Sequence, residues 1–194
     1  NNADDETPKP GDYRLQNVEN YLIATPKQSL QEASLASSEA GITPLILGDS
    51  LEGESRDVGK MHAEKALQIQ KHGNPISPPA VILSGGETSV TVKGSGRGGP
   101  NTEFSLALLK ELQGQDGIWA IACDTDGIDG TGDNAGAFVS PESYKKAENL
   151  GLDPSGYLSN NDSYSFFHEL GDLISPGPTM TNVNDFRAIL VLQE

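Results

Sequence analysis

The first half of the sequence alternates short apolar runs with segments of helical pattern, and no other feature constrains the fold as strongly. The apolar runs are residues 21–24, 43–47 and 80–83, and helical segments at 26–40 and 54–71 separate them. A strand–helix–strand–helix–strand order at this spacing predicts two right-handed crossovers and a parallel sheet. We therefore expect an α/β fold.

The second half of the chain has a different pattern. Residues 89–93 alternate apolar and polar side chains, which predicts a half-buried strand that is antiparallel or at an edge. Pro100 is well placed to begin a helix that runs to about residue 113. We expect a mixed sheet with flanking helices here, with Trp119 in the core. The other expected strands are 118–123, 135–139 and 186–192, and the other expected helices are 141–150 and 163–170.

The composition along the chain predicts one folded unit after a polar tail. Residues 1–12 are polar and contain Pro8, Pro10 and Gly11, which indicates a tail or linker. We expect residues 13–194 to form a single α/β unit. Its first part is 13–83, and its second part, 84–194, carries the motifs described below.

The charge of the chain narrows the classes of partner. The 28 acidic residues against 13 basic ones give a net charge of −15, which argues against nucleic acid, and phosphate chemistry would need a divalent cation. The single cysteine, Cys123, cannot form an internal disulfide. We find neither a membrane-spanning apolar stretch nor a signal peptide, so we expect a cytoplasmic protein that binds no membrane.

A first chemical motif follows the apolar run at 80–83. It consists of Ser84, Gly85, Gly86, Glu87 and Thr88. Glycines at the carboxyl end of a strand let backbone N–H groups approach a ligand, and α/β sheets bind ligands at that end. The alternative is a tight turn in which the glutamate is merely solvated.

A second motif, residues 94–103, places four glycines around Arg97 immediately before a helix. The N–H donors of a helix N-terminus and a guanidinium both suit an oxyanion, so phosphate or carboxylate binding is expected here. The alternative is a flexible connection with one exposed arginine. The ligand-binding candidates in this motif, besides the arginine, are Gly98, Gly99, Asn101 and Glu103.

The same stretch matches a dinucleotide-binding pattern at Gly94, Gly96 and Gly99. That pattern requires a buried apolar strand before the first glycine, whereas residues 89–93 are half polar and Lys93 adjoins the glycine. The match therefore gives only weak support to an NAD-binding protein.

A third motif clusters four aspartates, Asp124, Asp126, Asp129 and Asp133, just beyond an apolar strand. Clustered carboxylates on glycine-bent loops suit hard divalent cations, although position 135 is alanine where a calcium loop would carry glutamate. Magnesium with phosphates, or aspartates that address a polyol or a reacting hydroxyl, fits better. An acidic surface turn is the alternative.

The run from residue 176 to residue 185 is dense in turn formers and small polar groups. Thr179, Asn182 and Asp185 could supply hydroxyl, amide and carboxylate contacts, or the run could simply connect a helix to the last strand. The three histidines are dispersed and form no metal-binding spacing.

Taken together, the motifs resemble the type-II glycerate kinases, a family whose members are also named hydroxypyruvate reductases. The stretch from residue 84 to the C-terminus is similar to their MOFRL domain, and the earlier part, with Gly48-Asp49 and Arg56, is similar to the segment before it. The motifs that carry the resemblance are SGGET (84–88), GSGRGGPNTEF (94–104), CDTDGIDGTGDNAGAFV (123–139) and GPTMTNVND (177–185).

The resemblance implies phosphorylation of D-glycerate with ATP and Mg²⁺. Arg97 would neutralise a phosphate or the glycerate carboxylate, and the glycines would admit backbone donors to oxyanions. At least one of the four aspartates would hold magnesium or accept the proton of the substrate hydroxyl. We assign catalysis to Arg97, Asp124 and Asp129 and metal binding to Asp126 and Asp133. The expected partners are a nucleotide and glycerate or hydroxypyruvate, and a homodimer is left open.

Three features depart from the family. The family usually has arginine at position 100 and glutamine at position 102, where this chain has Pro100 and Thr102, and Met180 stands where glycine is usual. Family members also carry an N-terminal Rossmann-like domain with a lysine implicated in catalysis, and their active site lies between the domains. We therefore expect this chain alone to be inactive. The alternatives are an NAD(P)H-dependent hydroxypyruvate reductase and a non-catalytic small-molecule-binding domain.

Overall fold

The computed structural model describes residues 7–193, and its centre is one six-stranded sheet of order β1-β2-β6-β3-β4-β5. Strands β1 and β2 are parallel, and every other neighbouring pair is antiparallel. The expected mixed α/β fold is thus confirmed. The strands are β1 (Thr43–Leu51), β2 (Ala80–Gly86), β3 (Ile118–Asp124), β4 (Gly136–Val139), β5 (Leu173–Ile174) and β6 (Asp185–Val191).

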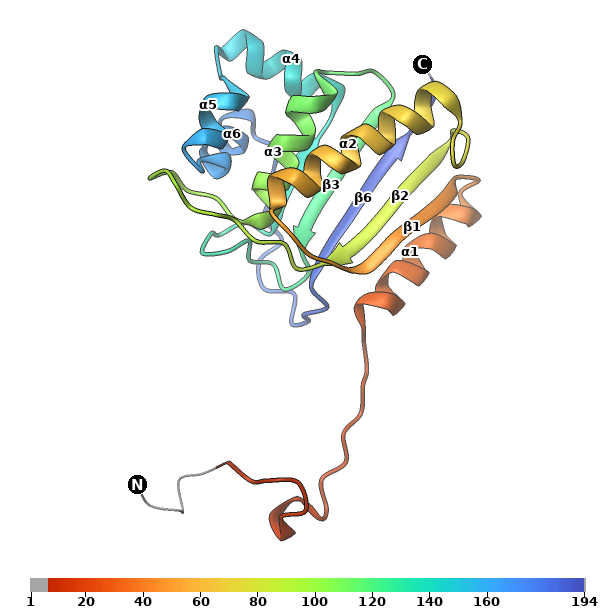
Figure 1. Ribbon diagram of the computed structural model, residues 1–194, viewed down its shortest axis with the longest axis vertical. Helices are drawn as coiled ribbons and strands as arrows, with labels where there is room; N and C mark the ends of the chain where they lie inside the picture. Colours follow the sequence, from red (N-terminus) through yellow and green to blue (C-terminus); the bar gives the residue numbers. More distant parts are fainter. Residues whose placement is uncertain (1–6, 194) are drawn as a thin grey trace.

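The helices are distributed unequally over the two faces of the sheet (Figure 1). Helices α2 (Ser55–His72) and α3 (Pro100–Leu112) cover one face, and α1 (Pro26–Glu39) lies on the other against β1 and β2. Three shorter helices, α4 (Pro141–Leu150), α5 (Pro154–Ser159) and α6 (Ser163–Leu170), gather near α3 at the β4–β5 side.

The hydrophobic core lies mainly between the sheet and the pair α2–α3. Its members from the sheet alternate with residues on the other face, as the period of a strand requires. A second, smaller cluster lies under α1, where Leu30 packs on Val81 and Leu83. Helices α1, α3 and α4 begin at the prolines where they were expected, and the unexpected α5 also begins at a proline. In the first turn of a helix the missing N–H of proline leaves no donor unpaired.

The strand expected at residues 21–24 does not form. Leu22 and Ile23 are 81% and 92% exposed, and residues 20–25 have no regular secondary structure. An extended run becomes a strand only when a neighbouring backbone pairs with it, and none of the described residues does so. The described part of the chain therefore contains one crossover, β1–α2–β2, where two were expected.

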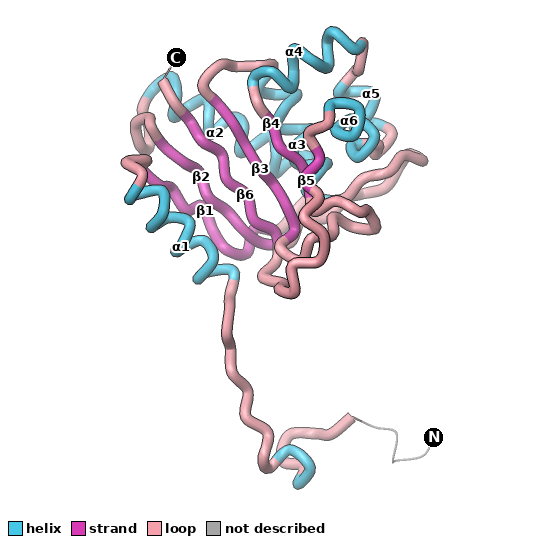
Figure 2. The backbone as a smooth tube through the Cα atoms, turned by 180° about the vertical axis from the view of Figure 1, so that it is seen from behind, coloured by secondary structure: helices cyan, strands magenta, loops and turns pink. Residues whose placement is uncertain are grey.

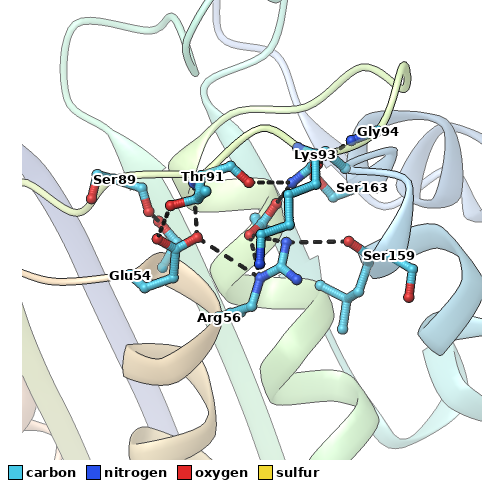
Figure 3. Close-up of polar contacts among 12 residues, drawn as sticks. Glu54, Arg56, Ser89, Thr91, Lys93, Gly94, Ser159 and Ser163 are labelled. Carbon is cyan, nitrogen blue, oxygen red and sulfur yellow. Dashed lines mark hydrogen bonds and ion pairs between the residues drawn. The ribbon is translucent and has the colours of Figure 1, made fainter.

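The strand expected at residues 89–93 is also wrong. The backbone of this segment is bound by side chains of other segments, and only an isolated bridge joins Ser89 to Glu54. Glu54 accepts bonds from the amide and hydroxyl of Thr91, while Asn161 accepts from the amides of Lys93 and Gly94 (Figure 3). These acceptors satisfy the donors that a strand partner would otherwise take.

Several features were not expected from sequence. The short elements α5 and β5 carry too little pattern to be predicted, and residues 7–25 extend away from the sheet (Figure 1). The first part of the expected tail, residues 1–6, lies outside the described residues. Between residues 7 and 193, none of the helices has both the length and the apolar character needed to span a membrane.

Candidate functional site

The sheet order brings three of the four motifs to one edge. In the register of the sheet, Asp185 at the start of β6 pairs with Gly86 at the end of β2 and with Asp124 at the end of β3. Because β6 runs antiparallel to both neighbours, its first residue meets their last ones. The SGGET, aspartate-rich and 177–185 motifs therefore converge at this point.

A cavity of about 480 Å³ opens at this edge. It is polar, and among the described residues that line it none is basic. Larger hollows of about 790 and 630 Å³ lie around Leu67 and Gln115 and contain none of the motif residues, so we place the candidate site here. The lining residues are Glu87, Thr88, Pro100, Asn101, Asp124, Asp126, Ile128, Asp129, Gly130, Asn182, Asn184 and Asp185.

The buried Asp129 caps helix α3. Its carboxylate accepts bonds from the amides of Asn101 (2.8 Å) and Thr102 (2.9 Å) and from the Thr102 hydroxyl (2.8 Å). Burial raises the pKa of Asp129, and these hydrogen bonds oppose the rise. The helix N-terminus that the sequence offered to a ligand oxyanion is thus occupied by a carboxylate of the chain itself.

A buried polar network continues from Asp129 behind the cavity. The side-chain amide of Asn101 donates to the carboxylate of Asp185 at 2.7 Å. Asp185 also accepts at 2.5 Å from the guanidinium of Arg187, which donates to the hydroxyl of Thr88 at 3.0 Å. Asn101 is 1% exposed and Arg187 is fully buried. The Oδ1 atom of Asn101 has no partner, so the wall of the cavity holds one buried acceptor that lacks a donor.

Arg187 is the residue that the sequence analysis missed. The signal was a single arginine within an otherwise apolar strand, because a buried guanidinium must have an acidic partner close by. Burial lowers the pKa of Arg187, while Asp185 opposes that shift. Arg187 also lies 5.1 Å from the centre of the Phe104 ring, which places it under α3.

Asp124 and Asp126 form one turn at the mouth of the cavity. The amide of Asp126 donates to Asp124 at 3.0 Å, and the amide of Ile128 donates to Asp126 at 2.8 Å. Burial, together with the charges of Asp126 and Asp185, raises the pKa of Asp124 to about 6. A carboxylate with such a pKa can exchange a proton near neutral pH.

Arg97 and Asp133 lie outside the residues that line the cavity. Their side chains, 50% and 75% exposed, form an ion pair at 3.1 Å. The guanidinium of Arg97 stacks 3.7 Å above the ring of Tyr164, whose hydroxyl donates to Asp133 at 2.8 Å. The hydrogen bond from Tyr164 lowers the pKa of Asp133. Both residues are thus engaged with each other and with α6.

The glycines of the second motif are required by close packing within the chain. A Cβ on Gly99 would collide with the carboxylate of Asp129, and one on Gly98 would collide with Ser163. Gly86 has a φ of +130° and lies against the backbone of Leu51, so it also needs glycine, and Gly85 lies against the backbone of Asp185. Steric contacts inside the protein account for these glycines without a ligand.

Two further candidates have structural partners. The buried Glu103 is paired with Arg56 at 2.7 Å and accepts from Asn161 at 3.1 Å, so it faces α2 and the turn between α5 and α6 and does not line the cavity. The hydroxyl of Thr179 donates to the carbonyl of Thr125, which closes the 177–185 loop onto the aspartate turn. Of the sequence-predicted residues, the cavity therefore brings together Glu87, Thr88, Asn101, Asp124, Asp126, Asp129, Asn182 and Asp185.

Comparison with known families identifies the class of protein. The MOFRL family matches residues 80–185, which is more than half of the chain and includes most residues of the site. The chain belongs to the MOFRL family.

The names of individual relatives are more specific than the name of the family. The chain is 52% identical over 188 residues to a protein of Agrobacterium vitis named "Putative hydroxypyruvate reductase", and 39% identical over 180 residues to the D-glycerate 2-kinase of Thermotoga maritima. These matches cover 96% and 93% of this chain but only 42% of each relative. The crystal structure of glycerate kinase from Thermotoga maritima superposes with a TM-score of 0.87 at 38% identity, over 91% of this chain and 42% of that one. The chain thus spans less than half the length of the relatives that it matches.

Proposed function

We propose that this chain is the carboxyl-terminal part of an ATP-dependent kinase that phosphorylates D-glycerate. The observation that carries the proposal is the cavity of about 480 Å³, in which carboxylates, amides and a hydroxyl from all four motifs meet at one edge of the sheet. Similarity to a D-glycerate 2-kinase and to a glycerate kinase structure supports the same substrate.

In this proposal the residues of the cavity bind and orient a small polyhydroxylated acid. The unpartnered Oδ1 of Asn101 accepts from a substrate hydroxyl, since a buried acceptor gains most from a ligand that donates. Asp124, whose pKa is about 6, accepts the proton of the reacting hydroxyl. Asp129 keeps Asn101 in place by capping α3, so we now assign it to positioning.

The residues present fit a magnesium ion that arrives with nucleotide phosphates. Among the described residues no group of three or more His, Cys, Asp and Glu side chains could hold a metal by itself. Magnesium is commonly held by one or two carboxylates together with substrate phosphates, and Asp126 would supply one, which leaves Asp124 as the proton acceptor. The ion would neutralise charge on the transferred phosphoryl group. The position of Asp133, paired with Arg97, favours Asp126 as the magnesium ligand.

The cavity is incomplete for phosphoryl transfer. No basic side chain lines it among the described residues, and the nearby Arg187 is fully buried and paired with Asp185. Phosphoryl transfer requires cations that stabilise the spreading negative charge. We therefore infer that the remainder of a longer protein supplies a cation across the cavity.

The second candidate is a hydroxypyruvate reductase that uses NAD(P)H. The name of the 52%-identical relative favours it. The dinucleotide pattern at residues 94–99 does not, because the strand that must precede it is absent and its three glycines pack on Asn160, Asp162 and Asp129. A non-catalytic binding domain is the third candidate.

The test compares two proteins in two assays. One is the 194-residue chain, and the other is a joined protein in which the part of the Agrobacterium vitis relative that precedes its match is placed ahead of this chain. We expect glycerate-dependent ADP release, requiring Mg²⁺, from the joined protein and little or none from the chain alone. Oxidation of NAD(P)H by hydroxypyruvate would support the reductase, and inactivity in both assays would support the binding domain. Robust ADP release by the chain alone would overturn the two-part site.

A further inference from the structure

One face of the sheet carries apolar side chains that no helix covers within residues 7–193. On this face α1 lies across β1 and β2, whereas β6, β3 and β4 are open (Figure 2). In the register, Trp119 stands beside Leu190, and Ile121 stands between Ala188 and Phe138, so these side chains share the face. The open face, as we call it, consists of Trp119, Ile121, Cys123, Phe138 and Leu190. Phe186 and Ala188, on the same face of β6, pack against the cluster under α1 and mark its border.

The alternation of burial along the strands shows that the open face lacks a covering helix. In β3 the residues under α2 and α3, such as Ile118 and Ala120, are buried. The intervening Trp119, which the sequence placed in the core, and Ile121 are only half-buried and belong to neither core cluster. Where α1 covers the same face, Leu83 is only 1% exposed. The difference comes from the presence of a helix and not from the residue types.

Strands β3 and β6 carry apolar side chains on both faces, as do the strands of a sheet that helices cover on both sides. Strands whose two faces are both apolar occur in α/β proteins with helices on both faces of the sheet. Neighbouring strands lie about 4.8 Å apart and packed helices about 8–10 Å apart, so one helix covers about two strands. α1 already covers β1 and β2, which leaves β6, β3 and β4 for the next helices.

We propose that the open face is a docking surface for helices from the part of the longer protein that this chain does not span. The relatives and the solved structure named above have more than half of their length outside the match. That part of the longer protein is a source of helices that could pack on the open face. Residues 7–25 lead directly into α1, which lies on the same face, so a preceding segment would be tethered beside it (Figure 2). A tether raises the effective concentration of the partner.

A second copy of the chain fits the open face less well. Each copy carries a net charge of −15, so two copies repel each other and gain no tether. A helix from the same polypeptide does not carry the net charge of a second copy, so it need not be repelled. The inference rests on the proposed longer protein, but it concerns packing, and none of its tests measures activity.

The first test uses Trp119, the only tryptophan of the sequence, as a probe of the open face. In the 194-residue chain we expect a monomer by light scattering, with fluorescence that iodide quenches equally at low and high protein concentration. A dimeric mass together with protection of Trp119 at high concentration would assign the face to a second copy and overturn the proposal.

The second test compares two substitutions of equally exposed apolar residues. Phe138 lies on the open face and is 37% exposed, and Met61 lies on α2 and is 38% exposed. In the chain alone, Phe138→Lys and Met61→Lys should shift Tm by similar amounts, within about 2 °C of each other. In the joined protein, Phe138→Lys should lower Tm by about 4 °C or more relative to Met61→Lys, because the lysine would be buried beneath a helix.

Equal shifts of the two variants in the joined protein would overturn the proposal, since they would show that the open face stays in solvent. Phe138→Thr repeats the comparison with a smaller polar side chain in case the lysine variant does not fold. Because loss of activity enters none of these readouts, a failed kinase assay leaves this inference standing.

Discussion

At the scale of single residues, the structure separates side chains that face the cavity from those that hold its walls. Asp129 illustrates the difference, because the sequence placed it among the catalytic aspartates and the fold uses it to cap α3. Arg187 illustrates the converse, since it belongs to no sequence motif and yet holds Asp185 and Thr88 at the site.

Replacing Asp129 should destabilise the protein. Asp129→Ala leaves the buried amides of Asn101 and Thr102 without an acceptor, and we expect a loss of about 1–3 kcal/mol in the free energy of unfolding. Urea denaturation measures it, with Asp133→Ala as the control because Asp133 is mostly exposed. Equal stability of the Asp129→Ala variant and the wild type would contradict the capping role.

The raised pKa of Asp124 predicts a pH dependence of stability. A carboxyl with a folded pKa of about 6 binds more protons in the folded state, so stability falls as pH rises from about 4 to about 6. Because Asp124 is only partly buried, solvent screens part of this effect, so Asp124→Asn should remove that decline and be the more stable protein at pH 7 by on the order of 1 kcal/mol. Denaturant unfolding at pH 4 and pH 7 tests this, with Asp116→Asn as a control for loss of one exposed charge. If the stability of Asp124→Asn fell between pH 4 and pH 7 as much as that of Asp116→Asn, the raised pKa of Asp124 would be disproved.

The oxyanion-binding role expected for Arg97 stays a prediction, because its side chain lies outside the residues that line the cavity and pairs with Asp133. Arg97→Ala should lower kcat/KM for glycerate in the joined protein by roughly 100-fold, and Arg97→Lys should not restore it, because an ammonium lacks the planar fork. The side chain of Arg97 is half exposed and its ion pair with Asp133 is at the surface. Arg97→Ala should therefore change the free energy of unfolding by no more than about 1 kcal/mol. A large loss of stability with unchanged kinetics would make Arg97 a clamp between Asp133 and Tyr164.

At the scale of elements, segment 89–97 is ordered by acceptors from distant parts of the chain. Asn160, Asn161 and Asp162, in the turn between α5 and α6, accept from the backbone amides of residues 93–97. Glu54 does the same for Thr91 (Figure 3). The segment is irregular, and yet the amides of Ser89, Thr91 and residues 93–97 all have acceptors, which a sequence pattern does not reveal.

Removing Asn161 should release this segment. Asn161→Ala removes the acceptor of the Lys93 and Gly94 amides and also places alanine at a φ of +53°. We expect these two amides to exchange hydrogen at least about 10-fold faster, with the amides of α2 unchanged. Asn161→Gly tolerates the φ, so equal acceleration in both variants assigns the effect to the lost acceptor. Unchanged exchange at both amides would show that the acceptor is dispensable.

At the scale of the whole molecule, α1 covers only β1 and β2 on one face of the sheet, and no basic side chain lines the cavity among the described residues. The relatives named above have more than half of their length outside the match, since this chain spans about 42% of each. Our two proposals assign the cover of the open face and the missing cation to that part.

The sequence by itself determined the fold class, most helix boundaries and the family. Proline at helix starts, apolar runs in β2 and β3, and the spacing of four motifs are local signals that survive in any context. It also located the aspartate turn and the edge of the sheet at which Asp124 and Asp126 face the cavity.

Only the tertiary structure decided which motif residues meet. Asp129 and Glu103 turned inward because α3 and Arg56 offered donors. Residues 21–24 found no backbone partner among the described residues, and residues 89–93 found one only at Ser89, so neither segment became a strand. Strand pairing, capping by a distant carboxylate and the burial of Arg187 all depend on which segments the fold brings together. That proximity is a property of the packed chain, and no local pattern of residues encodes it.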